Sequence, residues 1–156
     1  MDAAIDRAEL TTTRRAFAAW SLEIPSSFAD TFVRGDGYWH AYDAHRSVSL
    51  TSSTVTDKGR TVSPDLIARQ FPVLDGEAVD VLPSGLLGQA VTTDAPQPAR
   101  ASRMLSGMLA AEGRLLIVTI TSDDLNWALR IWLSIRPYPA QSPGEDRTPG
   151  ERGRMS

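Results

Sequence analysis

The residues best suited to chemistry lie close together in the first third of the chain. Asp36, His40, Asp43 and His45 fall within one short stretch, and imidazole and carboxylate groups can bind metals or transfer protons. In an extended strand His40 and His45 point to opposite faces, so a shared site requires the turn at Asp43 to redirect one of them. A small metal-dependent enzyme using His40, Asp43 and His45 is therefore an alternative interpretation, and the main expectation is a chain without metal or other cofactor.

Common catalytic and nucleotide-binding motifs are absent from the sequence. It has no Gly-x-Gly-x-x-Gly, no phosphate-binding loop and no Gly-x-Ser-x-Gly nucleophile elbow. Cysteine is absent too, which excludes disulfides, thiolate zinc sites and a cysteine nucleophile. Asp123 and Asp124 are expected to cap a helix, because adjacent helical residues point about 100° apart and make a poor acid–base pair. We therefore predict a protein that is not an enzyme.

Aromatic side chains in residues 38–42 are better candidates for a binding surface. Tyr38, His40 and Tyr42 alternate along a predicted strand and therefore share one face, while Trp39 takes the other. If Trp39 faces the core, the Tyr/His face is exposed. Tyr and Trp are enriched at the energetic centres of protein interfaces, so this face is a candidate surface for a protein partner.

A second candidate surface lies on the predicted C-terminal helix. Trp127 falls on the polar side of that helix beside Arg130, a combination suited to anchoring a partner. The alternative is that Trp127 packs under the N-terminal segment or under the loop predicted at residues 26–37. Met104 and Met108 are expected to fill the core, although methionine also suits an adaptable binding surface.

The hydrophobic pattern predicts a chain made mostly of strands. Strands are predicted at residues 15–24, 38–42, 47–56, 77–82, 86–93, 100–111 and 115–121. Residues 100–111 also have helical spacing, but a hairpin into the next strand explains them more simply. Helices are predicted from Ser63, as cap, to Phe71 and from Ser122 until Pro137, which ends the second helix. The buried stripe expected of this C-terminal helix is Leu125, Ala128, Leu129, Trp132 and Ile135.

This order of elements predicts an α+β fold, in which helices cover an antiparallel sheet. We expect a flexible N-terminus at residues 1–13, one domain at 14–138 and a disordered tail at 139–156, which is rich in Pro, Gly and mixed charge. The 156 residues carry a net charge of −3, which argues against nucleic-acid binding. No apolar run is long enough to span a membrane, and the lack of cysteine fits a cytoplasmic protein.

Three phrases of the sequence resemble the PsbP-like superfamily, which includes the DcrB-like and Ran-binding Mog-type proteins. They are SLEIPSSF, YWHAYDAHRSVSLTSS and VTITSDDLNWALRIWLSIRPYP, and the resemblance covers about residues 17–138. It implies a PsbP-like α/β/α sandwich, a sheet with helices on both faces, and no shared active site. Members are mostly binding or adaptor modules, and some act at photosystems and some on a small GTPase. Related bacterial proteins are chaperones that bind apolar helices of secreted effectors.

We therefore expect a non-catalytic protein-binding or adaptor module. One role of this kind is that of a chaperone or accessory factor for a secreted protein. A protein partner is expected, and a homodimer is an open alternative. The predicted binding residues are Trp127, Arg130, Tyr38, His40 and Tyr42. A small-molecule-binding domain with a pocket between sheet and helix is the other alternative.

Overall fold

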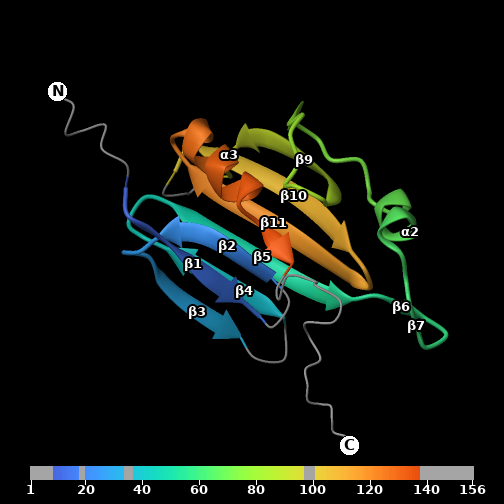
Figure 1. Cartoon of the computed structure of the whole chain (residues 1–156). Coiled ribbons are helices and arrows are strands. Elements are labelled where there is room, and N and C mark those ends of the chain that lie inside the picture. Colours follow the sequence, from blue (N-terminus) through green and yellow to red (C-terminus); the bar gives the residue numbers. More distant parts are fainter. Residues whose placement is uncertain (1–8, 18–19, 34–36, 97–100, 138–156) are drawn as a thin grey trace, which may run out of the picture.

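The computed structural model describes residues 9–17, 20–33, 37–96 and 101–137 (Figure 1). Within them, the largest element is an antiparallel sheet of seven strands in the order β3-β4-β5-β11-β10-β9-β8. Its strands are β3 (Ala29–Val33), β4 (Tyr38–Tyr42), β5 (Ser47–Thr54), β8 (Glu77–Ala78), β9 (Leu87–Asp94), β10 (Arg103–Ala111) and β11 (Arg114–Ser122). Every pairing in the sheet is antiparallel, which confirms the predicted α+β class with an antiparallel sheet.

Smaller elements complete the described chain. A three-stranded sheet has the order β1-β2-β12, and β6 pairs with β7 in a short hairpin. Their bounds are β1 (Thr11–Ala16), β2 (Trp20–Pro25), β12 (Arg136–Pro137), β6 (Thr56–Asp57) and β7 (Arg60–Thr61). The two helices are α2 (Pro64–Arg69) and α3 (Leu125–Leu133), and neither is long and apolar enough to span a bilayer.

The core lies on one face of the large sheet, under α3 and β2. Trp132 of α3 and Trp20 of β2 are both fully buried. From the sheet they meet alternate apolar side chains, which are Val48, Leu50, Leu105, Leu109, Leu116, Val118 and Ile120. Helix α2 lies at one end of the sheet, beside β9 and β10 (Figure 1). The described residues therefore show a helix and a small sheet over one face, but not a complete helical layer on each face.

Several local predictions are confirmed. The β4–β5 hairpin turns at Asp43 as predicted, and Asp43 Oδ1 accepts hydrogen bonds from the amides of His45 and Arg46, both at 2.8 Å. Ser63 caps α2, with its Oγ accepting from the Leu66 amide at 3.4 Å. Residues 103–111 form the predicted strand β10, which pairs with β11.

The N-terminal predictions need correction. Instead of one strand at residues 15–24, the chain forms the β1–β2 hairpin, because Phe17 has a left-handed backbone (φ 66°) and ends β1. Of the segment predicted to be flexible, Thr11–Thr13 belong to β1 and residues 1–8 lie outside the described part. The predicted loop at 26–37 contains the edge strand β3, whose ordered backbone depends on its pairing with β4.

The start of the C-terminal helix was also predicted wrongly. Ser122 ends β11, and α3 begins after Asp124, whose Oδ1 accepts from the amides of Asn126 and Trp127 at 2.9 and 3.3 Å. Ser122 Oγ instead accepts from the Asp124 amide at 2.9 Å, which turns the chain from strand into helix. A hydroxyl at Ser122 can therefore support the helix start without being the cap itself.

The strand predicted at 77–82 is much shorter than expected. Glu77–Ala78 pair with β9 and the Val79 amide donates to the Ala90 carbonyl at 2.9 Å, after which the chain reaches the buried Trp132. The Val81 carbonyl, three residues after β8, accepts a hydrogen bond from Trp132 Nε1 at 2.9 Å. A buried indole N–H needs a hydrogen-bond acceptor, and the Val81 carbonyl is that acceptor. Because this carbonyl is bound to Trp132, it does not take part in a longer β8. The predicted disordered tail at 139–156 lies outside the described residues.

Candidate functional site

The face of the large sheet opposite α3 is composed of uncharged side chains. Side chains alternate between the two faces along a strand, so the pairing register assigns each residue to a face. On five neighbouring strands this face, here called the open face, consists of Ala29, Thr31, Tyr38, His40, Tyr42, Ser47, Ser49, Thr51, Ser53, Met104, Ser106, Met108, Leu115, Ile117, Thr119 and Thr121. All of them are half-buried or exposed and none is Asp, Glu, Lys or Arg; the register also places Ala110 on this face, where it is only 1% exposed near the end that α2 contacts. Surfaces designed for solubility carry about 25–35% charged residues.

Tyr38, His40 and Tyr42 form a ladder of stacked rings on the open face. The His40 ring lies 6.3 Å from Tyr38 and 5.0 Å from Tyr42 between centroids, with interplanar angles of 9° and 21°. Ser49 on the neighbouring strand accepts a hydrogen bond from Tyr38 Oη at 3.3 Å, and its Oγ lies 2.8 Å from His40 Nδ1. These contacts hold the rings in place, and the predicted shared face is confirmed.

Trp39 takes the opposite face, as predicted, and is only 2% exposed. Its Nε1 donates to Asp30 Oδ2 at 3.2 Å. The aromatic alternation in β4 therefore separates the buried Trp39 from the half-buried ladder.

Hydroxyl groups and thioethers make up much of the rest of the open face. Ser47 and Thr121 hydrogen-bond across β5 and β11 with an Oγ–Oγ1 distance of 2.7 Å. Met104 and Met108 are half-buried on this face, so the expectation that they fill the core is wrong. The core positions of β10 are the alternate ones, because the strand pairs in a single register with both neighbours.

Trp127 and Arg130 do not form the predicted exposed pair. Trp127 is only 5% exposed, whereas Arg130 is exposed to solvent. The buried residues of α3 are Trp127, Ala128, Ile131 and Trp132, and Leu125 and Leu129 are only half-buried. The stripe is turned toward Trp127 because Phe28, from the segment between β2 and β3, packs on it with ring centroids 5.9 Å apart. The alternative prediction, in which Trp127 packs under residues 26–37, is confirmed.

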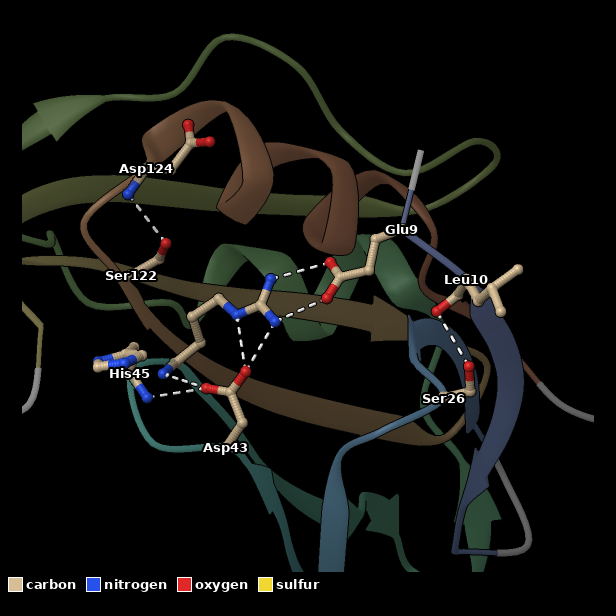
Figure 2. A network of polar contacts seen from close by, with 8 residues as sticks. Glu9, Leu10, Ser26, Asp43, His45, Ser122 and Asp124 are labelled. Carbon is tan, nitrogen blue, oxygen red and sulfur yellow. Dashed lines mark hydrogen bonds and ion pairs between the residues drawn. The ribbon is translucent and has the colours of Figure 1, made fainter. Parts of the chain in front are cut away.

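The cation above Trp127 is Arg46, which the sequence did not single out. Its Cζ lies 4.8 Å from the Trp127 ring centroid and 5.3 Å from that of Phe28. Its guanidinium also binds two carboxylates, Glu9 at 2.7 and 2.9 Å and Asp43 at 2.7 and 3.1 Å. Figure 2 shows Glu9 and Asp43 approaching one guanidinium from two sides. Arg46 thus connects the chain just before β1, the β4–β5 turn and α3.

The network fixes the charge state of its members. The hydrogen bonds from Arg46 lower the pKa of Glu9, even though partial burial opposes the shift. Burial raises the pKa of Asp43, but hydrogen bonds from the Arg46 side chain and from the amides of His45 and Arg46 outweigh it and lower the pKa overall. The two carboxylates in turn raise the pKa of Arg46. These groups stay ionised at neutral pH and serve as a structural clamp, not as proton donors.

The residues of the alternative metal site do not come together. His40 stacks in the ladder, the Asp43 carboxylate faces Arg46, and His45 is exposed on the turn. Among the described residues, no group of three His, Asp or Glu side chains is close enough to hold a metal ion. Asp36, the fourth residue of the predicted cluster, lies outside the described part.

Sequence reasoning also missed a cavity between the end of β1 and the edge strand β3. It has a volume of about 390 Å³ and is lined by Arg15, Phe17, Asp30, Phe32 and Trp39. Phe17 and Phe32 meet edge to face, with centroids 5.5 Å apart and an interplanar angle of 62°. No local sequence signal predicts this cavity, because its lining comes from two different sheets.

Comparison with known proteins supports the fold and nothing more specific. The sequence matches no protein-family model and no curated protein. The solution structure of PsbP (CyanoP) from the cyanobacterium Synechocystis sp. PCC 6803 superimposes with a TM-score of 0.53 and 12% identity, covering 84% of this chain and 94% of that chain. The predicted PsbP-like resemblance is confirmed as a likeness of fold. At this identity the likeness carries no residue roles.

Proposed function

We propose that this chain is a non-catalytic protein-binding module and that the open face is its docking surface. The observation that carries the proposal is the absence of Asp, Glu, Lys and Arg from the open face of five neighbouring strands. Charged residues are depleted in the centre of protein interfaces, while Tyr and Met are enriched there. The ladder and the two methionines supply both enriched types. The serines depart from the average interface, and they indicate a docking surface with many neutral hydrogen bonds.

A docked partner also accounts for the difference from the expected α/β/α sandwich. The described residues place α3 over one face of the sheet, whereas on the open-face side α2 and the segment after it cover only the end at β9 and β10. In this proposal, an element of another molecule supplies the second layer. A chaperone or accessory factor for a secreted protein is one such role, and a cytoplasmic location, which cell fractionation tests, belongs to the proposal.

The test compares partner capture by three tagged forms of the chain in lysate of the source organism. One form is wild type, one carries Tyr38→Ala, His40→Ala and Tyr42→Ala, and the control carries Thr56→Ala, which changes an exposed residue of β6. Quantitative mass spectrometry should show a protein enriched by wild type and control but at least about 10-fold depleted with the ladder variant, because loss of hot-spot rings costs more than 1 kcal/mol. Equal recovery by all three forms would show that a different protein does not dock on the open face.

A second candidate function is small-molecule binding in the cavity beside β3. Its volume of about 390 Å³ lies within the usual range for ligand sites, and three of its five lining residues are aromatic. A screen of small aromatic compounds should raise the melting temperature of wild type but not of Phe32→Ala. If no compound discriminates between the two proteins, this candidate fails.

A further inference from the structure

We infer that the open face binds a second copy of this chain, face to face about a two-fold axis. This inference rests on the proposed function and names the occupant of the docking surface. In a two-fold interface the same patch meets itself, so a charged residue close to the axis meets its own like charge. The chain has 35 formally charged residues, from 16 Lys and Arg and 19 Asp and Glu, yet the open face contains none of them.

The absence of charge favours a second copy over an unrelated protein. Different proteins usually recognise each other with complementary potentials, which steer association and fix the register. The open face has no formal charge to complement. Its hydroxyl groups, by contrast, each donate and accept hydrogen bonds, so rows such as Ser47, Ser49 and Thr51 can pair with identical rows.

The size of the open face is sufficient for a weak dimer. With strands about 4.8 Å apart and residues about 3.4 Å apart along each strand, five strands cover roughly 600 Å². Two copies would then bury about 1,200 Å², the lower end of the range for specific interfaces. Two sheets packed in this way would lie about 10 Å apart, as in a sandwich. An interface at this lower limit should give a weak dimer, so dimerisation should depend on protein concentration.

The test places charge near the centre of the face at Thr119, which pairs with Ser49 on one side and Ser106 on the other. Sedimentation equilibrium from about 1 µM to 1 mM should give a dimer for wild type, while Thr119→Asp and Thr119→Lys alone should dimerise at least about 10-fold more weakly, because like charges meet. An equimolar mixture of the two variants should recover the association. Thr56→Asp and Thr56→Lys, on the exposed hairpin strand β6, serve as matched controls and should behave as wild type.

Circular dichroism confirms that each variant is folded, and Ser106→Lys with Ser106→Asp replaces the Thr119 pair if either variant unfolds. A wild-type protein that stays monomeric at 1 mM would overturn the inference, as would a mixture that associates no better than the separate variants. These results are distinct from failure of the proposed function. A monomeric wild type that still loses its captured partner in the ladder variant refutes only the second copy, whereas equal capture by all forms refutes the docking of a different protein.

Discussion

Gly107 in the middle of β10 is a position where the core leaves no room for a side chain. It lies on the core face of the sheet, under the ring of Trp132. A Cβ added there would lie 2.5 and 2.6 Å from Trp132 Cζ3 and Cη2, and 3.1 Å from the Cβ of Ala90. Atoms in ordinary contact are about 3.5–4.0 Å apart, so the indole would have to move by about 1 Å. Trp132 is fully buried and its Nε1 is bound to the Val81 carbonyl, so this movement is costly.

Gly107→Ala should lower the free energy of unfolding by about 1–2 kcal/mol. Overpacking a core typically costs about 1–3 kcal/mol. Alanine is favoured over glycine inside a strand by about 0.5–1 kcal/mol, which offsets part of the clash but does not exceed it. Urea denaturation followed by circular dichroism measures the difference. The control is Ser106→Ala, the preceding residue on the open face, which should change stability by less than about 0.5 kcal/mol.

A double-mutant cycle tests whether Trp132 is the cause of the loss. Trp132→Phe removes the ring atoms that the new methyl group would meet. The double variant should therefore lose about 1 kcal/mol less unfolding free energy than the two single variants lose together. Strict additivity, or a Gly107→Ala variant within about 0.5 kcal/mol of wild type, would refute the packing argument.

Two further predictions concern Arg46 and α3. Arg46→Gln should lower the free energy of unfolding at pH 7 by about 1–3 kcal/mol, through lost ring contacts and charged hydrogen bonds, as urea denaturation will show. Because Arg46 holds the pKa values of Glu9 and Asp43 below their ordinary 4.5 and 3.8, wild type should lose stability as the pH falls through this region. The variant should lose less, and equal slopes would contradict the clamp. Trp127→Ala should cost about 3–5 kcal/mol and Arg130→Ala less than about 0.5, and similar losses in thermal or urea unfolding would disprove the packing described for α3.

Local regularities explain why the sequence predicted the ladder correctly. Alternation along a strand separates Tyr38 from Trp39 whatever the strand's neighbours are, and Asp43 directs its own turn through bonds to the next residues. The same reasoning failed for Trp127. The spacing of apolar residues shows which side of a helix is most hydrophobic. Which side is buried depends on the residues that pack against the helix, and here Phe28 from a distant segment packs against Trp127.

The sequence by itself determined the α+β class, the position of most strands and the shared face of Tyr38, His40 and Tyr42, because these follow from periodicity and turn chemistry over a few residues. Only the tertiary structure decided that Arg46 clamps Glu9 and Asp43 over Trp127, and that the Tyr/His face continues into an uncharged surface on five strands. Both features depend on the order of strands in the sheet. Pairing between residues far apart in the chain sets that order, and no local pattern encodes it.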